Sequence, residues 1–483
     1  MERKRKSLGV NAALNGFRQL LNFVFPLITF PYTSRVLSVN SMGIYNFSNN
    51  YVNYFMLVAA LGISTYAVRE GARYRDDTLK LGDFASQVFT LNILSTIISY
   101  GLLIISLVAF TILRKYMICI LVFSLQIIFT TIGTEWIYTI YEDFAYITIR
   151  SIVFKIFSIL LLFILVRRPS DYLNYATITV LASVGSNVLN YFHAKSFINI
   201  RMTKDFVAIK KHLRPVFTIF FSSIAVNIYV SSDTTILGLM KGDHSVGIYG
   251  VASKIYSIVA PLLASILVVT VPRLAMFYGK RKFDEYKAVL EYVIRTMTLL
   301  VLPSAIGMIM LAPSIITIIS GSKYIYASSP LKMLSIALIF SLFNTILSEC
   351  VLIPARLETK LLHTNIIAAL FNLGLNLILI PFLSYNAAAF TTVLSECVSL
   401  ILNFWYSKKL MTEIVKNKNI IQNLFQVVCG CAAIIVCCLL FDTLNIPFIL
   451  KVVLQVATSI LSYGLILLLM RNQALLEIVR KVF

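Results

Sequence analysis

Long apolar runs alternate with short, polar and mostly basic segments along the whole chain. Nearly every run reaches the length of about 20 residues that a helix needs to cross the ~30 Å hydrocarbon core of a bilayer. The pattern therefore predicts an all-α membrane protein with about fourteen transmembrane helices. The predicted spans are residues 11–36, 43–67, 84–111, 116–140, 150–166, 172–194, 215–240, 247–271, 289–312, 329–353, 362–383, 387–406, 421–441 and 449–470.

Polar side chains interrupt the first two apolar runs at depths where lipid offers no hydrogen-bond partner. Each polar group left unsatisfied in hydrocarbon costs several kcal/mol, so a helix surrounded by lipid would not hold so many. We therefore expect a helix pair with one face on lipid and the other on a water-filled cavity. The polar residues are Asn11, Asn15, Arg18, Gln19 and Asn22 in the first run, and Asn46, Asn49, Asn50 and Asn53 in the second.

Composition and charge agree with this class. Of the 483 residues, 59% are hydrophobic and only 13% are charged, whereas soluble domains carry about 25% charged residues. Most of the 42 Lys and Arg residues fall in loops on one predicted side, which places both termini in the cytoplasm. The net charge of +21 is then explained by contact with anionic membrane lipids, and no nucleic-acid partner is expected.

Several kinds of chemistry are not indicated. The seven cysteines lie inside apolar runs, without the spacing of a zinc site or of a disulfide framework. No Gly-rich phosphate-binding loop of the G-x-x-x-x-G-K-[ST] type occurs, and the loops are too short for a soluble catalytic domain. We therefore expect no metal, no cofactor and no enzymatic activity.

Three short matches indicate an internal repeat. Gly43–Tyr54 resembles Gly247–Ile258, and both segments begin with Gly-Ile-Tyr. Thr134-Glu135 also matches Ser348-Glu349, and Leu189-Asn190 matches Leu402-Asn403, at offsets of about 204 to 214 residues. We therefore predict two six-helix lobes related by an axis along the membrane normal, an arrangement typical of alternating-access transporters. The predicted lobes are residues 1–205 and 206–410, and residues 411–483 form two extra helices and a cytoplasmic tail.

A charged side chain at membrane depth raises the free energy of the folded protein, so each such cation is a candidate for a functional role. Arg18 lies about two turns into the first predicted span, and Lys254 lies about two turns into the eighth. Each belongs to the opening helix pair of its half of the repeat, so both are predicted to line one cavity and to bind an anion such as a phosphate. Asn50 is the repeat counterpart of Lys254, and Arg35 and Arg295 would extend the basic surface. The alternative is that these side chains reach to the membrane interface or form structural ion pairs.

Carboxylates inside the predicted spans are candidates for coupling to an ion gradient. Asp233 lies in the middle of a span among small hydroxylated residues, and Glu135 and Glu349 occupy equivalent places in the repeat. Each would exchange H⁺ or Na⁺ if it faces water, or would pair with a neighbouring cation if it does not. Arg69 and Glu70, at the inner end of the second span, would form a cytoplasmic gate pair or a solvated helix end.

Several segments also resemble a known family. FPLITFPYTSRVL at residues 25–37, LGISTYAVREGARYRDD at 61–77 and TEWIYTIYEDFAYITIRSIVFKI at 134–156 are similar to bacterial polysaccharide flippases of the Wzx type, which belong to the multidrug/oligosaccharidyl-lipid/polysaccharide exporter superfamily. The resemblance implies fourteen helices in two lobes around a central cavity, in the bacterial plasma membrane. It further implies movement of an undecaprenyl-diphosphate-linked oligosaccharide for O-antigen, capsule or exopolysaccharide synthesis, alongside other polysaccharide-assembly proteins.

Two other functions remain as alternatives. A multidrug or cation antiporter of the same superfamily would be expected to have an acidic, aromatic cavity, which Arg18 and Lys254 contradict. A membrane enzyme of polysaccharide synthesis would be expected to carry a large outer loop or a carboxylate cluster, and the sequence has neither.

Overall fold

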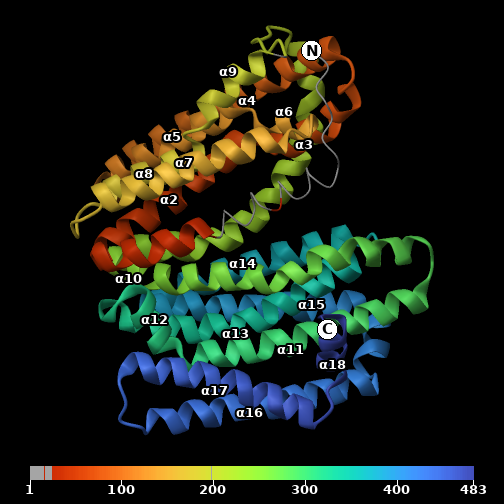
Figure 1. Ribbon diagram of the computed structural model, residues 1–483. Coiled ribbons are helices and arrows are strands. Elements are labelled where there is room, and N and C mark those ends of the chain that lie inside the picture. The colour runs from red at the N-terminus through yellow and green to blue at the C-terminus, as the bar shows by residue number, and fades with distance from the viewer. Residues whose placement is uncertain (1–15, 17–23, 197, 483) are drawn as a thin grey trace. The chain divides into compact units, whose positions relative to one another are not determined.

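The computed structural model describes residues 16, 24–196 and 198–482. In these ranges the chain forms helices, turns and loops and no β-strand (Figure 1). The contacts divide the chain into an N-terminal unit, Met1–Gly247, and a C-terminal unit, Ile248–Phe483.

The N-terminal unit begins with helical residues 24–36. It continues with α2 (Val39–Ala60), α3 (Ile63–Gly71), α4 (Thr78–Ala109), α5 (Met117–Gly133), α6 (Glu135–Ile140), α7 (Phe144–Leu165), α8 (Tyr172–Val184), α9 (Asn187–Lys195) and the first part of α10 (Phe206–Gly279). The rest of α10 belongs to the C-terminal unit, together with α11 (Phe283–Met310), α12 (Ala312–Ser320), α13 (Ser328–Thr345), the π-helix η4 (Ile346–Leu352), α14 (Glu358–Leu383), α15 (Tyr385–Val415), α16 (Lys418–Asp442), α17 (Phe448–Leu469) and α18 (Gln473–Val482).

In the part of the chain that the structure describes, eleven helices are long and apolar enough to cross a bilayer, which confirms an all-α multi-pass membrane protein. The other three predicted spans have separate explanations. Residues 11–36 lie partly outside the described residues, and residues 172–194 are divided between α8 and α9. Residues 215–240 and 247–271 are joined within α10, whose helical geometry breaks at Gly242 (φ 76°, ψ −173°).

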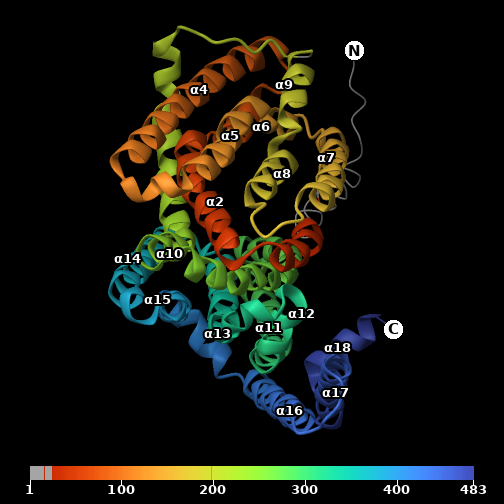
Figure 2. The ribbon, with the colours of Figure 1, turned by 90° about the vertical axis from the view of Figure 1, so that its left-hand side faces the viewer.

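The N-terminal unit packs α2 against α4 and α5, and α8 against α5 and α7 (Figure 2). Large apolar side chains fill the region where α3, α4 and α6 meet, among them Tyr66, Phe84 and Trp136. Polar side chains tie the helices together: the hydroxyl of Ser99 donates to the Phe55 carbonyl oxygen at 2.6 Å. Such bonds between helices are a common way to hold a bundle together where lipid supplies no hydrophobic force.

Two glycines explain why the repeat begins with Gly-Ile-Tyr. A Cβ atom at Gly43 would lie 1.9 Å from the Asp243 carbonyl oxygen, and one at Gly247 would lie 2.2 Å from the Val39 carbonyl oxygen. The start of α2 and the segment after the Gly242 break therefore touch backbone to backbone. Asp243 adds an ion pair with Lys115 and accepts a hydrogen bond from the Tyr116 hydroxyl.

The C-terminal unit packs α15 against α13 and α14, and α11 against α13. The last long helices, α16 and α17, lie side by side, and α16 packs against α11 (Figures 1 and 2). The Tyr463 hydroxyl on α17 donates to the Leu299 carbonyl oxygen at 2.7 Å, which fixes this pair to the rest of the unit. The predicted boundary at residues 205 and 206 stays a prediction, because the contacts group the first part of α10 with α2.

Candidate functional site

The side chain of Asn50 joins α2 to α10 inside the N-terminal unit. Its Nδ2 donates to the Ser231 carbonyl oxygen at 2.7 Å and to Thr235 Oγ1 at 2.9 Å. The Tyr54 hydroxyl lies 3.1 Å from the same Thr235 oxygen. The amide nitrogen of Asn50 is thus committed to interhelical bonds, and its substrate-binding role stays a prediction.

Asp233 lies on α10 beside this junction. The residue is 5% exposed, and the neighbouring Ser231 and Ser232 are buried as well. Its side chain interacts with nearby residues, so a coupling role would require those contacts to change when the carboxylate gains or loses a cation. A buried carboxylate among hydroxyl groups is the environment expected for such a role.

Of the two predicted cavity cations, only one can be placed. Arg18 lies outside the described residues, whereas Lys254 lies half-buried on α10 in the C-terminal unit. No carboxylate of the described residues lies within 4.0 Å of the Lys254 ammonium group. A cation at membrane depth without an acidic partner favours a functional role over a structural ion pair.

Arg295 has a different environment from the one its predicted role requires. Its side chain is 10% exposed, and its Nη2 lies 3.3 Å from Glu477 Oε1 on α18. Its Nε lies 3.7 Å from Glu291 Oε1, and its Nη1 donates to Gln473 Oε1 at 3.2 Å. These contacts favour the structural alternative, in which Arg295 anchors α18 to α11. Arg35 is exposed near the end of residues 24–36, and its predicted role stays untested.

The predicted gate pair is present as an ion pair at the end of α3. Arg69 Nε lies 3.4 Å from Glu70 Oε1, and Arg73 Nη1 lies 2.8 Å from Glu70 Oε2. Arg69 and Arg73 are 58% and 70% exposed. Exposed pairs of this kind contribute at most about 1 kcal/mol, so the contact is compatible with a pair that opens and closes.

Glu135 borders a polar pocket of about 240 Å³ in the N-terminal unit, which we call the N-terminal pocket. It forms at the level where α2, α5 and α8 each give way to a short second helix. The breaks fall at Leu61-Gly62, at Thr134 and at Gly185-Ser186, and Leu61, Gly62 and Thr134 have positive φ. The pocket is lined by Met56, Ala59, Ala60, Ile63, Ser64, Asn92, Ile127, Thr130, Thr131, Glu135, Trp136, Ser183, Val184 and Asn187.

Two residues missed at the sequence level form the floor of this pocket. Asn92 Nδ2 donates to the Ala59 carbonyl oxygen at 2.8 Å, and Asn187 Nδ2 donates to the Phe129 carbonyl oxygen at 3.1 Å. Both carbonyls lie close to helix breaks, where the regular hydrogen-bond pattern ends. An asparagine inside an apolar run is the signal that could have identified them.

Arg150 is a further functional residue that the sequence pattern does not single out, because it stands at the edge of the predicted span 150–166. Helix α7 begins six residues earlier than expected, at Phe144, which places Arg150 inside the helix with 7% side-chain exposure. Its Nη2 lies 3.7 Å from Glu135 Oε1, and its guanidinium carbon lies 5.4 Å from the Tyr146 ring centroid. Glu135 therefore has a buried cation beside it.

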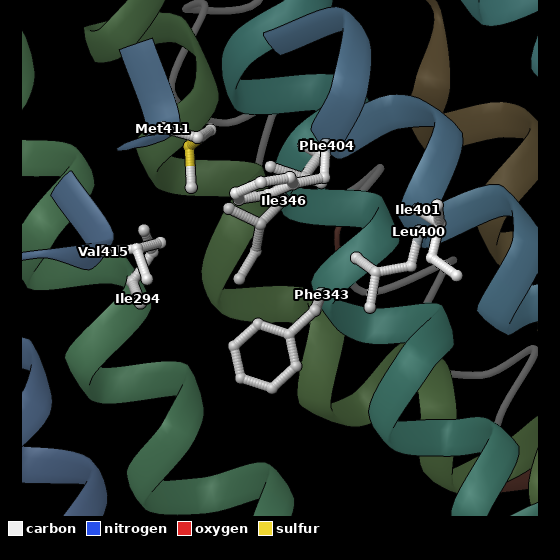
Figure 3. A pocket seen from close by; sticks show the side chains of 9 residues that line it. Ile294, Phe343, Ile346, Leu400, Ile401, Phe404, Met411 and Val415 are labelled. Atoms are coloured by element: carbon white, nitrogen blue, oxygen red, sulfur yellow. The ribbon is translucent and has the colours of Figure 1, made fainter. Parts of the chain in front are cut away.

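The repeat counterpart of Glu135 has a contrasting environment. Glu349 is exposed on the π-helix η4, and the neighbouring groove is entirely apolar (Figure 3). This C-terminal groove has a volume of about 370 Å³. It is lined by Ile294, Phe343, Ile346, Leu347, Leu400, Ile401, Phe404, Met411 and Val415.

The fold is that of known membrane transport proteins. It resembles the lipid II flippase MurJ in an inward closed conformation, with a TM-score of 0.73 at 15% identity over 96% of this chain and 99% of that chain. It also resembles an inward-facing multidrug resistance MATE family transporter of the MOP superfamily, with a TM-score of 0.63 at 16% identity over 82% of this chain and 95% of that chain.

The family follows from the sequence matches. Residues 8–278 match the polysaccharide biosynthesis protein family, and residues 218–378 match the MatE family. The first match covers more than half of the chain, so the chain belongs to the polysaccharide biosynthesis protein family. The putative O-antigen transporter of Escherichia coli (strain K12) is 25% identical over 422 residues, which cover 85% of this chain and 100% of that protein. The resemblance drawn from residues 25–37, 61–77 and 134–156 is thereby confirmed.

Proposed function

We propose that this protein moves a lipid-linked oligosaccharide across the bacterial plasma membrane for surface polysaccharide synthesis. The observation that carries the proposal is the family match over residues 8–278, together with similarity along the whole length of a putative O-antigen transporter. Lys254, which has no carboxylate of the described residues within 4.0 Å, supplies a cation for the diphosphate. Movement proceeds by alternating access driven by an H⁺ or Na⁺ gradient. The distribution of Lys and Arg supports cytoplasmic termini.

The test is complementation of a bacterial strain that lacks its own flippase. Expression of this chain should restore surface polysaccharide, and the lipid-linked intermediate that accumulates in the parent strain should disappear. Intermediate that persists on the cytoplasmic side, although the protein is present in the membrane at normal level, would contradict the proposal.

A multidrug antiporter is the second function considered, because residues 218–378 match MatE and a MATE transporter shares the fold. The same strains provide the comparison. An antiporter would lower the accumulation of cationic dyes and raise drug resistance without restoring polysaccharide, whereas a flippase would do the reverse.

A further inference from the structure

The lining of the N-terminal pocket is more polar than the exposed surface of the helices around it. Its lining residues Ala60, Ser64, Thr130 and Ser183 are exposed, so the pocket opens on the surface of the unit. Much of the exposed surface elsewhere consists of large apolar side chains, as on α4 and α7. Hydroxyl groups, carboxamides and a carboxylate at such an opening would be poorly solvated by lipid, so the opening must meet water or a polar ligand.

The charge of the pocket is nearly balanced. Glu135 is the one ionisable residue in the lining, and Arg150 lies 3.7 Å behind it. Arg150 is buried, and its Nε and Nη1 have no hydrogen-bond partner in the described residues. A carboxylate neutralised in this way attracts a bare cation only weakly. An anion would be repelled, because the carboxylate lies closer to the pocket than the guanidinium group does. The balance favours a neutral ligand.

The size of the pocket also argues against a single ion. Its volume of about 240 Å³ is far larger than the space that a bare ion occupies. An ion without its water would contact only a small part of the lining. A compact molecule with the dimensions of one sugar ring would instead reach both the mouth and the floor.

The remaining lining residues match the chemistry of a sugar. Asn92 and Asn187 use their amide nitrogens to bind backbone carbonyls. This fixes the carboxamides in place, and the Glu135 carboxylate can accept hydrogen bonds from ligand hydroxyl groups. Met56, Ala60 and Trp136 supply apolar surface for the C–H face of a ring. Half of the fourteen lining side chains are polar and half are apolar, and such a mixed lining suits a sugar ring, which has hydroxyl groups at its edge and C–H groups on its face.

We propose that the N-terminal pocket binds one neutral sugar unit of the transported oligosaccharide, with Glu135 as the principal hydrogen-bond acceptor. This inference rests on the proposed flippase function and adds to it a place where the sugar, rather than the diphosphate, is recognised. Residues at the three helix breaks then determine which repeat unit the protein accepts.

The chain offers a reporter for this site, because it contains only two tryptophans. Trp136 lines the pocket, and Trp405 is 63% exposed on α15 in the C-terminal unit. In the full-length Trp405→Phe variant, the tryptophan emission comes from Trp136 alone when excitation is chosen so that tyrosine does not absorb. The probes are methyl glycosides of hexoses, 6-deoxyhexoses and N-acetylhexosamines, followed by the oligosaccharide released from the lipid-linked intermediate of the flippase-deficient strain.

We expect a saturable change in Trp136 emission with at least one glycoside and with the released oligosaccharide. Glu135→Gln in the same background should weaken apparent affinity about tenfold, since a hydrogen bond to a charged carboxylate is replaced by a weaker one to a neutral amide oxygen. Ser183→Leu should abolish the response by filling the mouth. Thr177→Leu is the matched control, because Thr177 is exposed on the same helix but does not line the pocket.

Two results would overturn the inference. One is the absence of any saturable response to the released oligosaccharide, and the other is a response to Na⁺ or pH with none to sugar, which would mark an ion site. Complementation is scored separately. Restored polysaccharide with no sugar response at Trp136 removes the inference and leaves the proposed function intact, whereas sugar binding without complementation removes the proposed function.

Discussion

The two halves of the repeat place opposite chemistry at equivalent positions. In the N-terminal unit, the segment around Glu135 borders a pocket with seven hydroxyl, carboxamide or carboxylate side chains in its lining. In the C-terminal unit, the segment around Glu349 borders a groove lined only by apolar side chains. The offset of the nearby match aligns Asn187 of the pocket with Leu400 of the groove.

The backbone explains part of this difference. Helix α5 ends at Gly133, and the left-handed Thr134 begins a new helix, so carbonyl groups near the break need side-chain partners. In the C-terminal unit the equivalent segment continues from α13 into the π-helix η4 without such a break. A broken helix requires polar neighbours, whereas a continuous one can be surrounded by apolar residues.

The largest effect is expected when Asn187 of the N-terminal pocket is replaced by leucine, the residue at the equivalent position of the C-terminal groove. Asn187→Leu removes the bond to the Phe129 carbonyl oxygen and the oxygen that accepts from Asn190 at 3.4 Å. We expect surface polysaccharide per unit of membrane protein to fall more than tenfold in the complementation assay. Output near the wild-type level would show that the polarity of the pocket is unimportant.

Removal of the Lys254 cation should have the next largest effect. Lys254→Ala is expected to lower polysaccharide output about tenfold, which corresponds to about 1.4 kcal/mol of lost interaction with an anionic group. Lys254→Arg keeps the charge and should retain most of the output. Equal output from all three proteins, compared at matched protein level, would exclude Lys254 from substrate binding.

A moderate effect is expected at the buried carboxylate of the N-terminal unit. Asp233→Asn keeps the size of the side chain but removes its ability to bind H⁺ or Na⁺. Transport in vesicles should then depend only weakly on the imposed ion gradient. If the mutant responds to the gradient as the wild type does, Asp233 is not the coupling group.

The reciprocal exchange should have the smallest effect. Leu400→Asn introduces a polar group into the apolar groove, and an unsatisfied group of this kind costs about 1–3 kcal/mol. We expect a lower melting temperature in detergent, measured by loss of tertiary structure, with transport per folded molecule close to the wild-type value. A strong loss of transport without a change in stability would show that the groove has a function of its own.

Much of the fold could be predicted from the sequence, because apolar length and the positions of Lys and Arg respond directly to the bilayer. Breaks inside helices could not. The apolar run at residues 172–194 predicts one span, although α8 ends at Val184 before Gly185, and residues 215–271 predict two separate spans, although these join in α10 around Gly242. Such breaks depend on close approaches, as at Gly43 and Gly247, which only packing defines.

The candidate site was predicted less completely, for a related reason. The sequence singles out Glu135 as an ionisable group at membrane depth, whereas its partner Arg150 falls at the edge of the predicted span 150–166. For Arg295 the sequence leaves a cavity cation and a structural ion pair as alternatives, and the three side chains from α11 and α18 that surround it favour the ion pair. A charged residue in an apolar run is a candidate for a functional or structural role. Whether its side chain forms an ion pair or lines a cavity depends on helices that are distant in the sequence.

The sequence by itself determined the class of protein, the repeat and the family, because hydrophobic length and local motifs are properties of contiguous residues. The tertiary structure decided which polar groups share a pocket and which neutralise one another. Those relations arise from distances between residues on different helices, such as the 3.7 Å between Arg150 and Glu135, and no local pattern contains them.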